Sequence, residues 1–392
     1  MKNLYVLAAG GTGGHLFPAE SLAQELKARG GTVVLFTDER AAKWVQASCF
    51  DRVIVSNFRQ STPKRQLRSK LPFTSLPFIR FLIKRGRSKL KKFIFVNGLV
   101  FCGLKSLLFF IFHRPRAVVG FGGYPSAPTV FAAQILGIRS VLHECNAIIG
   151  RANKILARKA SAITTGFSHV VNLDDKAKHK QIFTGNPVRS KISALANVPY
   201  VAPTDCLRIF VVGGSQGAHL FANVVPYAMQ QLKGVNVHIT MQVGIDDIQR
   251  VGNLFKQNGI EAELAPFFED IDEILARSHV VISRSGATSL AEFAARGLPS
   301  VLVPLKGSRD GDQLYNAMQF EANGASVLIQ EQAFSPNALG VVLLELHNNL
   351  RVLEEMSQAA REMFVKSAVL NLAEIVIGSD LSPSNKVHLK YN

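Results

Sequence analysis

Cysteine is scarce in this chain, and the spacing of the few cysteines present gives them no shared role. The four are far apart and form no Cys-x-x-Cys pair: Cys49, Cys102, Cys145 and Cys206. This argues against a disulfide framework or a structural zinc site, and it is typical of a reducing compartment. The zinc-protease motif His-Glu-x-x-His is also absent. We therefore expect no cofactor and no obligatory protein-bound metal.

Acidic residues are missing from a long stretch of the first half. Between Arg52 and His143 there is no Asp or Glu, whereas the same window contains 17 Lys and Arg. The whole chain has 45 basic and 28 acidic residues, so without these 17 it has 28 of each sign, and the net charge of +17 comes entirely from this window. Such a surface attracts anionic lipid, a phosphate-bearing substrate or nucleic acid.

Short apolar runs alternate with helical patterns through the 392 residues, of which 47% are hydrophobic. The first run, at 4–9, ends at two glycines, and we interpret it as a buried strand and not as a signal peptide. Strands are predicted at 4–8, 32–36, 52–55, 117–119, 140–142 and 162–164, and then at 207–212, 237–240, 280–283 and 300–303. This alternation predicts parallel sheets covered on both faces.

The pattern therefore predicts an α/β fold of two doubly wound, Rossmann-like domains facing a central cleft. We expect residues 1–188 to form an N-terminal domain and residues 189–365 a C-terminal domain. Residues 366–392 are expected to form a helix and tail that return to the first domain. Ligands of such sheets bind beyond the carboxyl ends of the strands, so the predicted site is the cleft.

The run at 93–112 fits this scheme less directly. It is mostly apolar, interrupted by Asn97 and Lys105, and it has the length of a bilayer span. A buried helix preceding the strand at 117 accounts for it equally well. Because the sheet pattern resumes at once beyond it, we favour the buried helix over membrane embedding.

Two glycine-rich turns occupy equivalent places, each after the first strand of its half. Residues 10–15 read Gly-Gly-Thr-Gly-Gly-His, and residues 213–218 read Gly-Gly-Ser-Gln-Gly-Ala. Glycines allow close approach of a ligand to the backbone, and the amides of a helix N-terminus favour anions. A local turn is the alternative for either motif alone. His15 titrates near neutrality and is a candidate general base, although a packed or capping histidine is the alternative.

Other polar segments follow predicted strands and should line the same cleft. Residues 283–292 place hydroxyls at a helix start, and Glu292 is suited to accept hydrogen bonds from ribose hydroxyls. The segments at 120–126, 143–146 and 184–189 are each as compatible with a turn as with a site. Arg189 lies at the domain junction, where it could reach the cleft.

Taken in order, these motifs closely resemble the MurG family of bacterial peptidoglycan glycosyltransferases. The resemblance is carried by GGTGGH, GFGGYPS, HECN, TGNPVR, GGSQGA, SRSGATSLAE and DQLYNA, and it extends to about residue 325. It implies a GT-B scaffold and inverting transfer of N-acetylglucosamine from UDP-N-acetylglucosamine, without a catalytic metal. The implied acceptor is lipid I, the undecaprenyl-pyrophosphoryl-muramoyl-pentapeptide, and the implied product is lipid II for peptidoglycan synthesis.

The resemblance also implies a role for individual residues. His15 corresponds to the favoured candidate for the catalytic base. The implied acceptor-binding residues are Gly14, His15, Tyr124 and Glu144. The implied donor-binding residues are Thr12, Gly13, Gly14, Asn146, Arg189, Ser215, Phe268, Ala287, Thr288, Ser289, Glu292 and Gln313.

The charge distribution agrees with a lipid-linked acceptor. Apolar residues at 71–83 are interleaved with and followed by basic ones, as in a segment that anchors to an anionic membrane surface. A solvated basic loop beside a core helix is the alternative. We expect a peripheral protein at the cytoplasmic face of the inner membrane. Anionic lipids and cell-wall synthesis proteins are its candidate partners, and nucleic acid is not.

Three other functions remain open on the sequence alone. A UDP-N-acetylglucosamine epimerase could use the same two-domain scaffold without a lipid acceptor, and a different lipid glycosyltransferase could use another acceptor. A basic adaptor that binds membranes or nucleic acid would need neither a sugar donor nor an acceptor. The adaptor is the weakest of the three, because it has no use for two glycine-rich turns facing one cleft.

Overall fold

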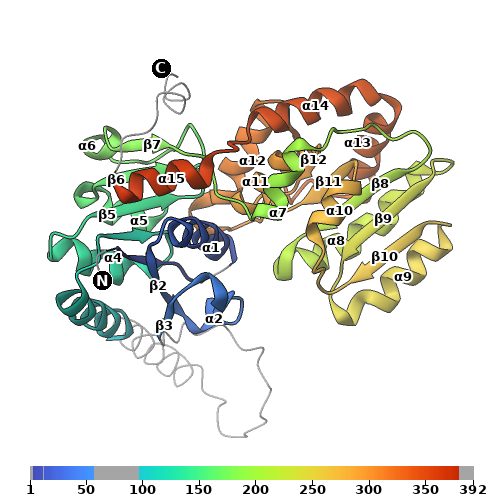
Figure 1. Ribbon diagram of the computed structural model, residues 1–392. Helices are drawn as coiled ribbons and strands as arrows, with labels where there is room; N and C mark the ends of the chain where they lie inside the picture. Colours follow the sequence, from blue (N-terminus) through green and yellow to red (C-terminus); the bar gives the residue numbers. More distant parts are fainter. Residues whose placement is uncertain (1–2, 12, 57–96, 379–392) are drawn as a thin grey trace, which may run out of the picture.

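The computed structural model describes residues 3–11, 13–56 and 97–378, with the backbone alone described at 214–218 and at Arg309. Within these residues the chain forms two parallel sheets, one in each half, each with helices packed around it (Figure 1). The predicted α/β fold of two doubly wound domains is confirmed. Thr12, the segment 57–96 and the tail from 379 onward lie outside the described residues.

The first sheet has seven parallel strands in the order β3-β2-β1-β4-β5-β6-β7. They are β1 (Leu4–Ala8), β2 (Thr32–Asp38), β3 (Arg52–Ser56), β4 (Ala117–Gly120), β5 (Ser140–Glu144), β6 (Ala162–Thr165) and β7 (Gln181–Phe183). The helices of this half are α1 (Gly13–Ala28), α2 (Glu39–Ala42), α4 (Ser126–Ile135), α5 (Arg151–Leu156) and α6 (Asp175–Lys178). Strand order reverses between β1 and β4, the point at which such sheets open a ligand crevice.

The second sheet repeats this plan with six parallel strands in the order β10-β9-β8-β11-β12-β13. They are β8 (Leu207–Val212), β9 (Val237–Gln242), β10 (Glu261–Ala265), β11 (Val280–Ser283), β12 (Ser300–Leu302) and β13 (Ser326–Leu328). Its helices are α8 (Gly214–Ala228), α9 (Ile248–Gln257), α10 (Ile271–Arg277), α11 (Ala287–Arg296), α12 (Asp312–Ala322), α13 (Pro336–Asn348) and α14 (Leu350–Glu362). The reversal here lies between β8 and β11. The short helix α7 (Ser190–Ala194) lies between the two sheets in sequence.

Short 3-10 turns complete the connections: η1 (Ala47–Cys49), η2 (Ala157–Lys159), η3 (Leu195–Asn197), η4 (Met229–Leu232), η5 (Ile245–Asp247) and η6 (Arg309–Gly311). The sequence patterns missed three strands, β7, β10 and β13, and each lies at an edge of its sheet. Edge strands are only partly buried, so their sequences need no continuous apolar run. β10, for example, reads Glu-Ala-Glu-Leu-Ala and has no fully buried residue.

The chain crosses back to the first domain at its end. Helix α15 (Ala368–Ile377) packs against α1, and the two lie side by side in Figure 1. Leu372 and Val376 are fully buried in the core that also contains Leu22 and Leu26 of α1. An ion pair of 2.6 Å between Arg29 and Glu374 supports the same contact. The first domain therefore depends on residues from both ends of the chain.

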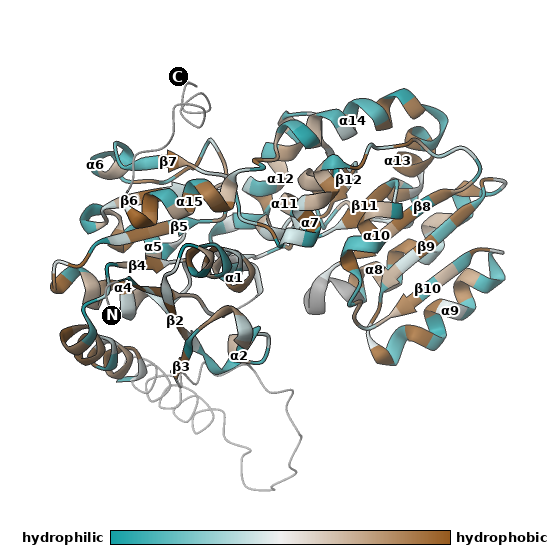
Figure 2. Ribbon diagram, viewed as in Figure 1, coloured by the Kyte–Doolittle hydropathy of each residue, from teal (hydrophilic) through white to brown (hydrophobic). Residues whose placement is uncertain are grey.

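The segment predicted at 93–112 is helical over 97–113 and packs on one side only. Phe110 is completely buried near Phe36, with ring centroids 6.1 Å apart. On the opposite side Phe101 and Phe112 are 70% and 79% exposed. The helix is coloured as mostly hydrophobic in Figure 2. No helix among the described residues is long and apolar enough to cross a membrane.

Candidate active site

One helix from each domain meets the other at the domain boundary. α1 follows β1, α11 follows β11, and the two helices are in contact. The Thr288 hydroxyl, in the first turn of α11, donates a hydrogen bond of 2.9 Å to the carbonyl of Gly14 in the first turn of α1. Both helix N-termini therefore face the same interdomain region, where their free amides favour negative charge.

A cavity of about 120 Å³ lies at this boundary and is lined by residues of both domains. The first domain supplies four residues that the sequence had singled out, namely His15, Tyr124, Glu144 and Asn146. The second domain supplies two carboxylates, Asp310 and Asp312. The remaining lining residues are Gly122, Gly123, Ile148, Gly150, Arg151, Ala152 and Asn153. The structure thus brings the candidate base His15 and two other predicted acceptor residues, Tyr124 and Glu144, into one space, whereas Gly14 is not part of the lining.

His15 is the third residue of α1 and is held against a glycine turn that follows β4. Gly122 and Gly123 have φ angles of +87° and +75°, and a Cβ atom on either would lie within 3.5 Å of the His15 ring. Only glycine adopts this backbone conformation without strain, and the turn it forms lies directly against the imidazole. The GFGGYPS motif therefore shapes the environment of His15.

The surroundings of His15 keep its ring neutral. Burial lowers the pKa of His15, and a hydrogen bond to the backbone of Phe121 offsets this only in part. Its Nδ1 atom is buried and has no hydrogen-bond partner among the described residues. His15 lines the cavity, and a neutral imidazole can accept a proton from a substrate hydroxyl.

Glu144 organises the loop beside this cavity. Its two carboxylate oxygens accept hydrogen bonds from the amides of Asn146 (3.1 Å) and Gly150 (2.9 Å) and from the side-chain nitrogens of Asn146 (3.2 Å) and Asn153 (2.9 Å). Burial raises the pKa of Glu144, while these donors lower it. The carboxylate lines the cavity, but its oxygens are already used to position the loop and Asn146.

Asn316 joins the two domains and was not identified from the sequence, although the motif DQLYNA contains it. It is fully buried in α12. Its amide nitrogen donates to the Asn146 side chain (3.0 Å) and to the carbonyl of Ser285 (3.1 Å), and its oxygen accepts from the amide of Ala147 (2.8 Å). Because these partners lie in both domains, Asn316 fixes the position of Asn146 relative to the second domain.

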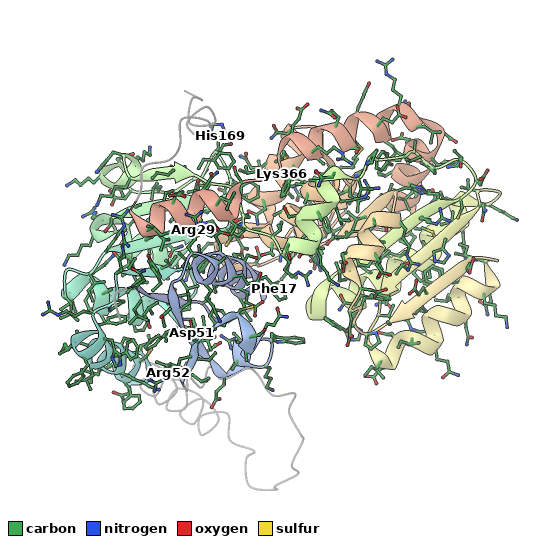
Figure 3. The ribbon with its side chains drawn as sticks, in the orientation of Figure 1. Phe17, Arg29, Asp51, Arg52, His169 and Lys366 are labelled. Atoms are coloured by element: carbon green, nitrogen blue, oxygen red, sulfur yellow. The ribbon has the colours of Figure 1, made fainter. Side chains whose placement is uncertain are left out.

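The opposite part of the boundary contains the predicted ribose-binding carboxylate. Glu292, on α11, is buried, and burial raises its pKa, although the adjacent Arg189 lowers it. Arg189 Nη2 lies 2.9 Å from Glu292 Oε1, and the same guanidinium lies 5.0 Å from the ring centroid of Phe17. Phe17, labelled in Figure 3, lies on the side of α1 that faces the second domain. Arg189 is therefore placed between the domains.

Other predicted donor residues are distributed along the same boundary. Gln313 accepts a hydrogen bond from the amide of Leu305 at 2.9 Å, and Phe268 is buried against Phe210 with ring centroids 6.3 Å apart. The first turns of α1 and α11 contain Gly13, Gly14, Ala287, Thr288 and Ser289. Thr12 and the side chain of Ser215 are not among the described residues.

Comparison with known proteins identifies the family. Residues 5–165 match the N-terminal domain of glycosyltransferase family 28, and residues 208–372 match its C-terminal domain. A protein of Methylobacterium radiotolerans is 40% identical over 380 residues, which cover 95% of this chain and 96% of that protein. The chain belongs to the MurG family within glycosyltransferase family 28. The relative is named UDP-N-acetylglucosamine--N-acetylmuramyl-(pentapeptide) pyrophosphoryl-undecaprenol N-acetylglucosamine transferase.

Further relatives of this MurG-family chain agree. A Bradyrhizobium sp. (strain ORS 278) protein of the same name is 39% identical, covering 95% of this chain and 97% of its own. Among solved structures, that of Acinetobacter baumannii MurG has a TM-score of 0.72 at 24% identity, covering 95% of this chain and 98% of that one. A UDP-N-acetylglucosamine 2-epimerase from Listeria monocytogenes reaches 0.60 at 12% identity, covering 100% and 97%. The fold is therefore shared with epimerases, and only the closer sequence relationship separates the two enzyme classes.

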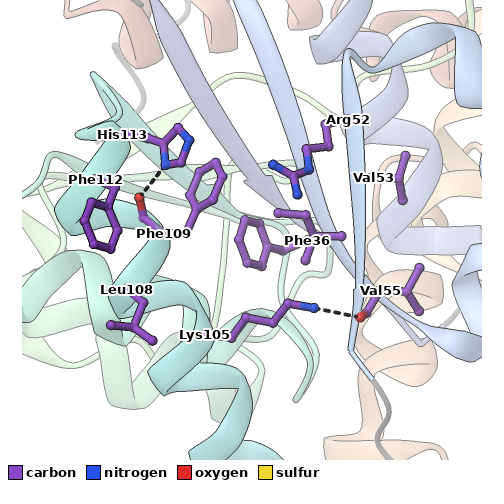
Figure 4. A pocket seen from close by; sticks show the side chains of 10 residues that line it. Phe36, Arg52, Val53, Val55, Lys105, Leu108, Phe109, Phe112 and His113 are labelled. Carbon is purple, nitrogen blue, oxygen red and sulfur yellow. Dashed lines mark hydrogen bonds between the residues drawn. The ribbon is translucent and has the colours of Figure 1, made fainter.

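A second cavity, among the described residues of this family 28 chain, lies away from the domain boundary. It measures about 410 Å³ and is a groove between the β2–β3 edge and the helical residues 97–113 (Figure 4). Its lining combines apolar side chains with the cations Arg52 and Lys105. It contains no residue predicted for donor, acceptor or catalysis. Among the described residues no cluster of three or more His, Cys, Asp or Glu side chains could hold a metal ion.

Proposed function

We propose that this chain transfers N-acetylglucosamine from UDP-N-acetylglucosamine to the muramoyl 4-hydroxyl of lipid I, giving lipid II with inversion at the anomeric carbon. The chief support is the 40% identity over 95% of the chain to a transferase of that name. The placement of His15 in a cavity lined by both domains agrees with it. A two-substrate transfer requires such a space, because donor and acceptor must meet while water is kept out.

In the proposed mechanism the first domain presents the acceptor hydroxyl to His15. The neutral imidazole takes the hydroxyl proton as the oxygen bonds to the anomeric carbon. The bond from that carbon to the diphosphate oxygen breaks on the opposite face, and UDP leaves with the electron pair. The amides at the start of α11 and the Arg189 guanidinium stabilise the charge that develops on the diphosphate.

The donor is held by the second domain in this proposal. Glu292 accepts hydrogen bonds from the ribose hydroxyls, and the Arg189 ion pair opposes the rise in the Glu292 pKa that burial causes. Asn146 and Gln313 contact the sugar, and the backbone at Phe268 meets the uracil. Ser215 and Thr12 complete the donor site. Because cationic and amide groups already face the diphosphate, we propose that no metal is needed.

The acceptor side is proposed to dock on the cytoplasmic leaflet of the inner membrane. The exposed face of the helix at 97–113 is apolar and consists of Val100, Phe101, Leu104, Leu108, Ile111 and Phe112. Lys105, in the same helix, and Arg52 lie beside it at the groove of Figure 4. An apolar face flanked by cations binds anionic bilayers. Anionic vesicles should retain the protein in sedimentation, and Phe101→Asp should weaken this without changing turnover of a soluble acceptor.

The decisive experiment is transfer of labelled N-acetylglucosamine to a short-chain lipid I analogue. Label should appear in a disaccharide-containing lipid only when the acceptor is present, and a chelator should not reduce the rate. If incubation with UDP-N-acetylglucosamine and no acceptor gives an epimerised sugar, the result would instead support the epimerase alternative. Transfer to diacylglycerol and not to the lipid I analogue would support a different lipid glycosyltransferase.

A further inference from the structure

The cavity that contains His15 has one permanently charged cation in its lining, Arg151. The three carboxylates of the lining are Glu144, Asp310 and Asp312. An anionic substrate that entered a space bordered by three carboxylates would be repelled unless a cation faced it. Arg151, the first residue of α5, is the side chain of this lining that can meet it.

Arg151 is paired with a carboxylate from the opposite domain. Its Nε atom lies 2.6 Å from Oδ1 of Asp310 in η6. The Arg151 side chain nevertheless remains 68% exposed, whereas that of Asp310 is 23% exposed. The Tyr124 side chain, on the predicted acceptor side, interacts with the same guanidinium. The guanidinium can therefore be reached by an incoming ligand while Asp310 is still in place.

The backbone at Asp310 is held in an unusual conformation. Its φ and ψ angles are 60° and 9°, in the left-handed region that non-glycine residues adopt at a cost. In the described part of the chain only Arg114 and Asn172 share a positive φ among non-glycine residues. In this conformation the Asp310 carboxylate lies across the boundary on Arg151.

We propose that Arg151 binds an oxyanion of the acceptor, either its diphosphate or a carboxylate of its peptide, and that Asp310 occupies Arg151 until the acceptor arrives. This rests on the proposed function. The planar guanidinium fits phosphate and carboxylate oxygens equally well. The acceptor oxyanion can therefore replace the Asp310 carboxylate without leaving Arg151 unpaired. Because Asp310 and Arg151 belong to different domains, this exchange also removes one contact between the domains.

The test compares acceptor KM in matched variants, with a short-chain lipid I analogue as the probe. Arg151→Gln should raise the acceptor KM at least tenfold and leave the dissociation constant of UDP-N-acetylglucosamine unchanged. Asp310→Asn should lower the acceptor KM several-fold, and the double variant should lose this gain. Arg158→Gln is the control, because the Arg158–Asp174 pair is similar (2.8 Å; 62% and 22% exposed) and lies outside the cavity lining. It should leave the acceptor KM unchanged.

A second acceptor analogue with amidated peptide carboxylates distinguishes the two oxyanions. If the Arg151→Gln effect persists with it, the ligand is the diphosphate, and if the effect disappears, the ligand is a peptide carboxylate. The proposal is overturned if the acceptor KM is unchanged in Arg151→Gln. It is also overturned if both single variants lose kcat equally at constant KM, because the pair would then only join the domains. Absence of transfer by the unmodified enzyme would instead refute the proposed function itself.

Discussion

The two sides of the domain boundary are built from different chemistry. The first domain contributes ionisable groups, with His143 and Glu144 buried and His15 partly buried. The second contributes the N-terminus of α11, whose first turn has no acidic residue, and the paired carboxylate Glu292. One side is suited to moving a proton, and the other to holding a nucleotide diphosphate. The difference teaches that similar sheets acquire separate roles from the side chains at their strand ends.

The largest effect on activity is expected from substitution of His15, the proposed base. His15→Ala should reduce kcat by roughly 10²–10⁴-fold, the usual contribution of general base catalysis. The donor dissociation constant should be unchanged, because the donor is assigned to the other side. Turnover measurements and donor titration by calorimetry check this. Near-normal turnover in His15→Ala would remove this residue from the role of base.

The pH dependence of the unmodified enzyme's activity should reflect the titration of His15. His15 must be neutral to accept a proton, and burial lowers its pKa below the ordinary 6.5. Activity is therefore present above this lowered pKa and is lost as the pH falls through it. We expect kcat/KM to fall with a midpoint below pH 6.5 and to approach a tenfold loss per pH unit at lower pH. A midpoint above pH 6.5 would contradict the assignment.

Substitution on the donor side should change the donor dissociation constant, which the His15 substitution leaves unchanged. Glu292→Gln keeps the side-chain volume but removes the charge that accepts from ribose and from Arg189. Hydrogen bonds to charged groups contribute about 1.5–3 kcal/mol, so the donor dissociation constant should rise roughly 10- to 100-fold. Glu355→Gln is a control, because Glu355 is also paired with an arginine but is exposed on α14. Unchanged donor affinity in Glu292→Gln would exclude the ribose contact.

A smaller loss of activity is expected from removing the hydrogen bond that joins the two domains at Thr288. Thr288→Val removes the hydroxyl that donates to Gly14, leaving that carbonyl without this partner. A neutral hydrogen bond contributes about 1 kcal/mol, which corresponds to roughly a fivefold loss of kcat/KM. Thr288→Ser keeps the hydroxyl and should retain most of the activity. Equal losses in both variants would show that the methyl group, and not the hydroxyl, is important.

The smallest predicted effect is spectroscopic. Trp44, the one tryptophan of the chain, belongs to the first domain, and its ring lies 6.2 Å from that of Phe267 in the second. Both side chains are 58% exposed. Phe267 adjoins the segment assigned to uracil, so UDP should alter Trp44 emission, and Phe267→Ala should abolish the change. Emission that does not respond to saturating UDP would place this contact apart from the donor site.

Much of the site could be predicted from the sequence because its residues lie at the ends of predicted strands. His15, Tyr124 and Asn146 follow strands of one sheet, Glu144 ends one of these strands, and all four line one cavity. The role of each side chain could not be predicted in the same way. Glu144 is separated from Asn146 by one residue in the motif HECN, but its oxygens bind the loop. That distinction depends on side-chain direction, which no spacing rule provides.

Local sequence alone determined the two parallel sheets, the glycine turns at their reversal points and the excess of cations in the first half. These depend on hydrophobic periodicity and on backbone preferences within a few residues. Only the tertiary structure decided that Arg151 meets Asp310 and that Asn146 meets Asn316, across 159 and 170 residues respectively. Such pairs form where two independently patterned domains pack together, and their packing depends on complementary surfaces that no local pattern encodes.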